Sequence, residues 1–305
     1  MTHASDFRLG VDLGGTKTEI IALTSEGQTL LRRRVATPRD CYGDIVATIT
    51  RLVHEAEVTL GGRGTVGVAM PGALSVTTGL VKNANTTSLI GRPFDDDLSA
   101  SLERPVRVDN DANCFTISEA VDGSAQGRRV VFGVIVGTGT GGGLVVDGRP
   151  IVGPNRIAGE WGHNPLPWPK ADELPGPGCY CGKSGCIETF LSGPGLVRCH
   201  EARGGEHTTA EAIVQAAQAD DPTAIETLRR YYDRLARSLA TVINLLDPDI
   251  IVVGGGMSNL PKLFELLPKL WQSLIFSDTT STIIAPPKHG DSSGVRGAAW
   301  LWPVR

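Results

Sequence analysis

Two segments of the chain share one pattern, in which an apolar run leads into glycines and a second run with apolar residues follows. Residues 8–23 read RLGVDLGGTKTEIIAL, and residues 130–146 read VVFGVIVGTGTGGGLVV. Each segment predicts a strand, a glycine turn and a second strand. The segments align at an offset of 123 residues. Because any two hairpins look alike, the repeat indicates either a duplicated fold or a coincidence.

Apolar residues recur at helical spacing in two further segments, which predict helices over 44–60 and 222–246. Asp220 or Asp221 can cap the second helix, and Pro222 suits its first turn.

Residues 250–253 predict a short buried strand that leads into three glycines. Strands that alternate with helices are typical of an α/β protein. Residues 165–178 are rich in proline and glycine, and they predict an ordered loop without a regular element.

Composition narrows the class of protein. A length of 305 residues predicts about two domains. Glycine accounts for 38 residues, about 12% against a usual 7%, so its positions are informative. A net charge of −4 gives no electrostatic argument for nucleic-acid binding. The chain starts without a signal-peptide pattern and has no apolar run long enough for a membrane span, which predicts a cytoplasmic protein.

Three glycine-rich loops follow strands, and such loops bring backbone N–H donors close to phosphates. They comprise Gly14, Gly15, Thr16 and Lys17; Gly137, Thr138 and Gly139; and Gly254, Gly255 and Gly256. The second loop fits G-x-G-x-x-G, but a strand follows it where a dinucleotide-binding fold needs a helix. A P-loop is absent because Pro177 stands where its first glycine belongs.

Two acidic residues stand at strand ends. Asp12 lies inside an apolar strand before the first glycine loop, where it either holds hydrated Mg²⁺ near phosphates or caps the strand end. Asp111 lies in VDNDAN, directly before a segment with helical periodicity. It is either a general base for a substrate hydroxyl or, like Asn110, a helix N-cap.

A cysteine cluster predicts structural zinc. Cys179, Cys181 and Cys186 lie within eight residues, and a histidine would complete a Cys₃His set. Spacing leaves both His163 and His200 as candidates. The scattered Cys41, Cys114 and Cys199 are read as ordinary thiols. Glu160 and Glu188 flank the cluster, where they either bind vicinal sugar hydroxyls or are surface acids.

Several motifs in order give the chain a family resemblance. They are DLGGTK at 12–17, NDAN at 110–113, GTGTGGG at 137–143, EWGH at 160–163, CYCGKSGCIE at 179–188 and GGG at 254–256. With these motifs the chain resembles the ROK family of sugar kinases across its length. KNAN at 82–85 and EWGHNPLPW at 160–168 look most like bacterial fructokinase/mannokinase, and N-acetylglucosamine kinases share most of the motifs.

The resemblance implies an α/β, actin-like (ribonuclease-H-like) ATPase fold with two lobes around a cleft. The N-terminal lobe would be residues 1–117, with a C-terminal helix at 293–305 returning to it. Residues 118–292 would form the C-terminal lobe with a zinc-bound loop.

The resemblance also implies roles for single residues. Asp111 is expected to be the catalytic base, and the glycine loops with Asp12 are expected to hold Mg·ATP. Zinc would be bound by His163, Cys179, Cys181 and Cys186, which favours His163 over His200 by analogy. The sugar would be bound by Asn85, Asn110, Glu160, His163, Glu188 and Gly72.

The expected activity is ATP- and Mg²⁺-dependent phosphorylation of the primary hydroxyl of D-fructose, and of D-mannose. An N-acetylglucosamine kinase or glucokinase is the alternative within enzymes, and a non-catalytic sugar-sensing regulator is the alternative outside them. A homodimer is expected, because family members commonly dimerise.

Overall fold

The computed structural model describes residues 7–38 and 41–302. Contacts along the chain divide it into two compact units, each built from separate segments. The first unit comprises residues 1–127, 143–158 and 291–305, and the second comprises 128–142 and 159–290.

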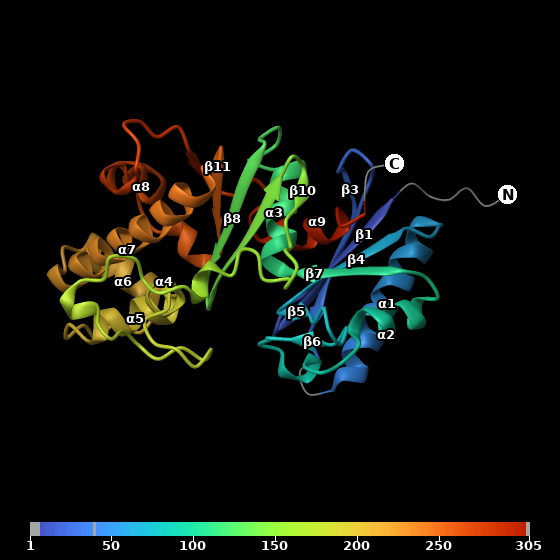
Figure 1. Cartoon of the computed structure of the whole chain (residues 1–305). Coiled ribbons are helices and arrows are strands. Elements are labelled where there is room, and N and C mark those ends of the chain that lie inside the picture. The colour runs from blue at the N-terminus through green and yellow to red at the C-terminus, as the bar shows by residue number, and fades with distance from the viewer. Residues whose placement is uncertain (1–6, 39–40, 303–305) are drawn as a thin grey trace. The chain divides into compact units, whose positions relative to one another are not determined.

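The first unit contains a five-stranded sheet in the order β3-β2-β1-β4-β7 (Figure 1). Its strands are β1 (Arg8–Leu13), β2 (Lys17–Leu23), β3 (Thr29–Ala36), β4 (Thr65–Met70) and β7 (Val106–Asn110). The antiparallel pairing of β1 with β2 confirms the hairpin predicted for residues 8–23. β4 pairs in parallel with both β1 and β7.

Helices cover both faces of this sheet because the residues of β1 alternate in direction. Leu9 and Val11 are buried in the same core as Ile45 and Ile49 of α1 (Tyr42–Leu60). The helix predicted over 44–60 is thus confirmed, with a start two residues earlier. α2 (Phe94–Leu102) packs beside α1.

The other face of the sheet is covered by α9 (Ser293–Ala299), which lies next to α3 (Asp111–Val121). α9 comes close to β1 and β4 because Gly10 and Gly67 have no side chains to keep its backbone away. α9 ends at Ala299, and residues 300–302 form a turn and a bend, so the described part of the helix expected at 293–305 is shorter than predicted. Residues 303–305 of the helix expected at 293–305 lie outside the described residues.

Short elements complete the first unit. β5 (Ala73–Leu74) pairs with β6 (Val81–Lys82), and a 3₁₀ turn spans Thr87–Leu89. α3 continues past residue 117, the lobe boundary expected from the sequence, and stays in the first unit.

A second five-stranded sheet has the order β10-β9-β8-β11-β12. Its strands are β8 (Val130–Val136), β9 (Thr140–Val146), β10 (Arg149–Pro150), β11 (Ile250–Gly254) and β12 (Ile283–Ala285). β8 and β9 are the two strands predicted for residues 130–146, and β11 contains the strand predicted at 250–253. β11 runs parallel to β8 and β12.

Helices of the second unit gather around α7 (Pro222–Leu246), which confirms the helix predicted there (Figure 1). Of the two candidate caps, Asp221 accepts the hydrogen bond from the Ala224 N–H at 2.7 Å. The neighbouring helices are α4 (Ile187–Leu191), α5 (Gly193–Glu201), α6 (Ala210–Gln218) and α8 (Leu263–Trp271). Short 3₁₀ turns lie at Trp161–His163, Ala171–Glu173, Gly256–Asn259, Gln272–Leu274 and Gly290–Ser292.

Candidate active site

The turn between β1 and β2 is solvent-exposed, with its backbone held from two sides. The Gly14 N–H donates to the Lys17 carbonyl at 3.0 Å, and the Thr37 hydroxyl donates to the Gly14 carbonyl at 2.8 Å. Gly15, Thr16 and Lys17 are exposed. The turn can therefore present N–H groups and one lysine ammonium to an anion.

Asp12 precedes this turn and is partly buried beside a second acid. Burial, then the charge of Asp111, then that of Glu19, raises the pKa of Asp12 to about 7. Arg34 opposes this shift. Two carboxyl groups so placed are stabilised by a nearby cation or by a shared proton.

Asn110 and Asp111 form the junction between β7 and α3. The side-chain oxygen of Asn110 accepts a hydrogen bond from the Ala112 N–H at 2.8 Å, so Asn110 is the N-cap of the helix. Oδ1 of Asp111 also accepts from this N–H at 2.8 Å, and Asp111 is exposed. The structure thus fixes Asp111 at a helix N-terminus, where a carboxylate is favoured.

Two more predicted sugar-binding residues lie near this junction. Nδ2 of Asn110 donates to the Gly72 carbonyl at 3.1 Å. Gly72 in turn lies against the backbone at Ala84, one residue before the exposed Asn85. Asn110, Gly72 and Asn85 are therefore brought together in the first unit.

The second unit brings two of the predicted glycine loops together. Gly255 has φ +82°, and a Cβ there would collide with the backbone of Val136. The Gly254–Gly256 loop consequently lies against the end of β8, where the turn from Gly137 to Gly139 begins. In that turn the Gly137 N–H donates to the Gly139 carbonyl at 2.9 Å.

Glu188 accepts a hydrogen bond from the residue that follows the same turn. Its Oε2 atom accepts a hydrogen bond from the Thr140 N–H at 2.8 Å. Glu188 lies in the first turn of α4, two residues after Cys186. The glycine turn and the cysteine loop are thereby linked through one carboxylate.

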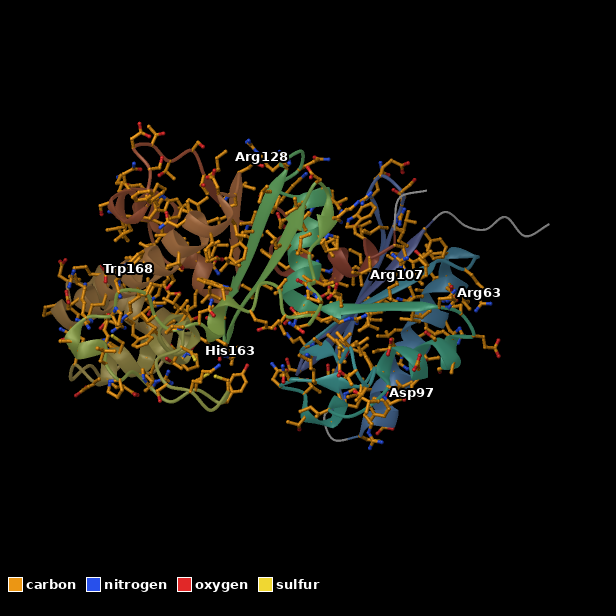
Figure 2. The ribbon with its side chains drawn as sticks, viewed as in Figure 1. Arg63, Asp97, Arg107, Arg128, His163 and Trp168 are labelled. Atoms are coloured by element: carbon orange, nitrogen blue, oxygen red, sulfur yellow. The ribbon has the colours of Figure 1, made fainter. Side chains whose placement is uncertain are left out.

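His163, which is labelled in Figure 2, converges with three cysteines in the second unit. One ligand atom from each of His163, Cys179, Cys181 and Cys186 lies within 4.8 Å of the others. His163 Nδ1 lies 3.6 Å from Cys179 Sγ, and Cys181 Sγ lies 3.7 Å from Cys186 Sγ. Tetrahedral zinc with its usual bond lengths holds such ligand atoms about 3.5–3.8 Å apart.

The electrostatics of this cluster favour a cation. Burial, then the Cys181 and Cys179 thiols, raises the pKa of Cys186 to about 12. A thiolate at Cys186 is therefore disfavoured unless a positive charge offsets it. The donor set and its spacing fit zinc.

The other candidate histidine lies elsewhere. His200 is buried, and its Nδ1 atom lies 3.2 Å from the Thr227 hydroxyl. Of the two histidines that the spacing left open, His163 is the one grouped with the cysteines.

Glu160 precedes the 3₁₀ turn Trp161–His163 and is exposed. The His163 N–H donates to the Glu160 carbonyl at 3.3 Å. This turn gives Glu160 and His163 a fixed separation along the backbone.

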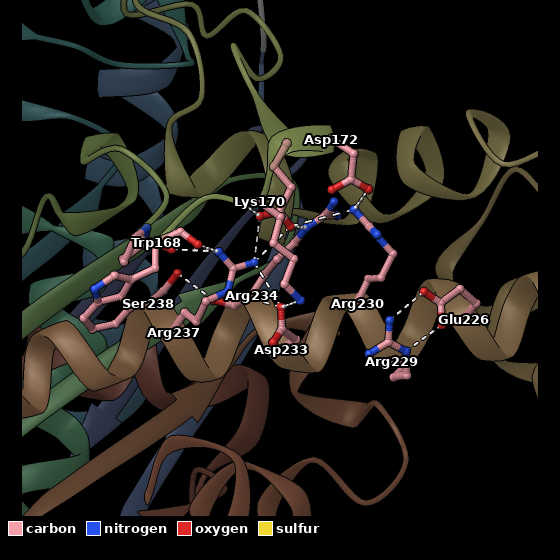
Figure 3. Close-up of polar contacts among 12 residues, drawn as sticks. Trp168, Lys170, Asp172, Glu226, Arg229, Arg230, Asp233, Arg234, Arg237 and Ser238 are labelled. Carbon is pink, nitrogen blue, oxygen red and sulfur yellow. Dashed lines mark hydrogen bonds and ion pairs between the residues drawn. The ribbon is translucent and has the colours of Figure 1, made fainter. Parts of the chain in front are cut away.

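A buried ion cluster holds the loop that leads to the cysteines (Figure 3). Glu173 accepts hydrogen bonds from Arg234 at 2.8 Å and from Arg237 at 2.9 Å. Arg237 also donates to the carbonyls of Pro167 and Trp168, at 2.7 and 2.9 Å. The loop is thereby fastened to α7, and the 3₁₀ turn at Ala171–Glu173 is a regular element that the sequence did not predict.

Comparison with known proteins decides the family. A model of the ROK family matches residues 8–305. The chain belongs to the ROK family.

Relatives of this ROK chain include named kinases. The N-acetyl-D-glucosamine kinase of Pectobacterium atrosepticum is 41% identical over 296 residues, which cover 96% of this chain and 97% of that protein. The Vibrio cholerae protein of the same name is 40% identical over 296 residues, covering 96% and 98%.

Solved structures agree with the ROK assignment. The ROK hexokinase of Thermus thermophilus has a TM-score of 0.85 at 29% identity, and 96% of each chain is covered. A ROK-family glucokinase of Streptomyces griseus, solved with glucose and AMPPNP, has a TM-score of 0.78 at 28% identity, covering 97% and 98%. The predicted fold class, an α/β, actin-like ATPase fold, is confirmed.

Sequence reasoning missed two features of this ROK chain. The ion cluster on α7 was signalled by arginines at 230, 234 and 237, which recur at helical spacing. Tyr180, inside the cysteine loop, was also missed, and its hydroxyl lies 3.0 Å from His163 Nε2.

Within 7–38 and 41–302, every helix is too short or too polar to span a membrane.

Proposed function

We propose that this ROK-family sugar kinase transfers the γ-phosphoryl group of ATP to the primary hydroxyl of N-acetyl-D-glucosamine. The observation that carries the proposal is the 38–41% identity to several N-acetyl-D-glucosamine kinases along 96% of the chain. The sequence motifs favoured fructose and mannose, with N-acetylglucosamine as the alternative. The relatives support that alternative better.

Asp111 is the proposed general base. The sugar oxygen attacks the γ-phosphorus of ATP in line, the bond from that phosphorus to ADP breaks, and the hydroxyl proton passes to the Asp111 carboxylate. Its exposed position at the N-terminus of α3 supports this role. A base of this kind contributes about 10²–10⁴-fold to the rate.

The glycine turns are proposed to bind the phosphates of ATP through backbone N–H groups, with Lys17 as an added cation. The exposure of Gly15, Thr16 and Thr138 supports access to these turns. Gly254–Gly256 is proposed to lie near the nucleoside.

Asp12 is proposed to hold hydrated Mg²⁺. The raised pKa of Asp12 supports a cation there, because a positive charge would offset its repulsion by Asp111. When bound, Mg²⁺ neutralises charge on the phosphates.

We further propose that His163, Cys179, Cys181 and Cys186 hold structural zinc. The spacing of their ligand atoms supports this. When bound, zinc supplies the cross-link that orders the loop from Cys179 to Cys186. Glu160, His163 and Glu188, on or next to this loop, are proposed to bind sugar hydroxyls, together with Asn110, Asn85 and the Gly72 backbone.

ADP release by the purified protein with Mg·ATP tests the substrate assignment. We expect the highest kcat/KM with N-acetylglucosamine among N-acetylglucosamine, glucose, mannose and fructose. A preference for fructose or mannose would overturn it, and a preference for glucose would favour the glucokinase alternative, which the likeness to the Streptomyces griseus enzyme supports. A mock purification from cells that do not express the protein measures any contaminating kinase.

Sugar binding without ADP release would instead favour the non-catalytic regulator. The expected homodimer stays a prediction, which light scattering of the purified protein tests.

A further inference from the structure

A partly open cavity of about 160 Å³ lies within the first unit, beside the N-terminus of α3. Its lining includes apolar residues, among them Met70, Leu74 and Val152. It also includes polar residues, among them Asp109 and Arg156, which are called its polar side below. A cavity of about 150 Å³ is large enough for a benzene-sized ligand.

Asp109 contributes an acceptor to the polar side. Its Oδ1 atom accepts hydrogen bonds from the Asn110 N–H at 2.7 Å and from Asn113 Nδ2 at 2.9 Å. Both donors therefore use the same oxygen. Oδ2 is the atom on which Asp109 can take a further donor.

Arg156 contributes donors to the polar side. It lies in a turn whose backbone is tied by Lys82, which donates to the Asn155 carbonyl at 3.2 Å. Arg156 has φ +53°, a conformation that costs about 1 kcal/mol or more for a residue with a side chain. Its charge lies close enough to lower the pKa of Asp109, although burial raises that pKa overall.

An acetamido group has three features that such a cavity can recognise: a carbonyl acceptor, an N–H donor and a methyl group. The cavity offers a cationic donor, a carboxylate acceptor and an apolar wall. Each hydrogen-bonding group of the ligand would thus meet a partner of the complementary type, an acceptor with a donor and a donor with an acceptor.

We propose that this cavity binds the 2-acetamido group of an N-acetylhexosamine, with Arg156 donating to the carbonyl oxygen, Asp109 accepting from the N–H and the apolar wall contacting the methyl group. This inference rests on the proposed function and names the residues that select its substrate. A 2-hydroxyl group lacks the carbonyl oxygen, the N–H and the methyl group that these residues would contact.

Selection arises because a site that hydrogen-bonds a substrate group binds an analogue without that group less well. Asp109 is partly buried and Arg156 is exposed. A hexose with a 2-hydroxyl would leave Arg156 and Asp109 without these hydrogen bonds. Removing Arg156 therefore changes the preference between the two sugars, beyond any common effect on both.

Arg156→Gly is the variant of choice, because φ +53° suits glycine and the substitution is expected to preserve the fold. Arg149→Ala removes another exposed cation of the same segment, on β10 and outside the cavity lining, and serves as the matched control. For each protein, kcat/KM is measured with N-acetylglucosamine and with glucose, and thermal unfolding checks the fold.

We expect Arg156→Gly to lower the ratio of kcat/KM for N-acetylglucosamine to that for glucose by roughly 10- to 100-fold, the effect of one hydrogen bond from a charged donor. The ratio should be unchanged in Arg149→Ala. An unchanged ratio in Arg156→Gly overturns the inference while the proposed function stands. A wild-type protein inactive on N-acetylglucosamine overturns both.

Discussion

Both carboxylate oxygens of Glu173 accept a hydrogen bond from Nη2 of Arg237, each at 2.9 Å. Glu173 is 4% exposed and Arg237 is 3% exposed. Removing one partner of a buried ion pair costs about 3–5 kcal/mol when the other charge is left unpaired. Arg237 would keep its ion pair with Asp233 at 3.0 Å. We therefore expect Glu173→Gln to lower the free energy of unfolding by up to about this amount in urea titrations.

Glu226→Gln is the matched control, because Glu226 pairs with Arg229 on the exposed side of α7. Its effect should stay within about 0.5 kcal/mol. A loss in Glu173→Gln no larger than that of the control would show that the ion cluster does not stabilise the loop.

The Glu173 effect should depend on pH. Burial opposes ionisation, but hydrogen bonds from the Lys170 N–H and Arg234 outweigh it and lower the pKa of Glu173 below 4.5. A lowered pKa contributes stability above the unfolded-state pKa, and this is lost as pH falls through the folded-state value. The difference in free energy of unfolding between wild type and Glu173→Gln should have its full value at pH 6 and should decrease below pH 4.5.

Cys181→Ser tests the zinc site. Loss of one thiolate from a Cys₃His set should reduce zinc from about one to near zero per chain by elemental analysis. The freed loop should also raise the sugar KM. Cys41→Ser, which changes an exposed cysteine outside the cluster, should retain the metal. Wild-type protein purified without zinc would contradict the assignment.

Asp111→Asn tests the base. The amide oxygen can still accept the hydrogen bond from the Ala112 N–H, so the helix start is preserved. We expect kcat to fall about 10²–10⁴-fold while sugar binding, measured by calorimetry, changes little. Asp96→Asn, an exposed acid in the first turn of α2, is the control. Near-wild-type turnover of Asp111→Asn would remove Asp111 from this role.

Asp12 should make stability depend on pH in the opposite sense to Glu173. Its pKa is raised from 3.8 to about 7 by burial and by Asp111 and Glu19. The folded state thus holds a proton that the unfolded state releases, so stability falls as pH rises from about 4 to 7. Without Mg²⁺ and nucleotide, the free energy of unfolding of Asp12→Asn should rise relative to that of wild type across this range, by on the order of a few kcal/mol.

Unfolding titrations at several pH values between 4 and 8 measure this difference. A difference between Asp12→Asn and wild type that stays constant with pH would contradict the raised pKa.

Features that depend on local patterns were predictable from the sequence. The periodicity of residues 222–246 predicted the bounds of α7, and Asp221 was one of its two candidate caps. The sequence also predicted the glycine turns after β1 and β8 and the acid at the start of α3, because the residues that form a turn or a cap lie within a few positions of one another. Four ligands of the cysteine cluster came from spacing and a family resemblance.

Features that depend on distant partners were not predictable. Glu173 lies 61 residues from Arg234. Asp109 and Arg156 face one cavity only because β7 and the turn after β10 are brought together by the fold. A single sequence shows which residues are charged, whereas the pairing of those charges is set by packing.

The contact of α9 with β4 is another such long-range feature. A Cβ at Gly67 would collide with the backbone carbonyl of Ala298. Because a backbone atom cannot rotate away, Gly67→Ala should lower the free energy of unfolding by about 1–3 kcal/mol. Gly43→Ala, in the first turns of α1, meets only Cys41 Sγ at 3.9 Å and should be neutral or stabilising by up to about 1 kcal/mol. Equal effects of the two substitutions in urea titrations would mean that α9 does not pack on β4 this closely.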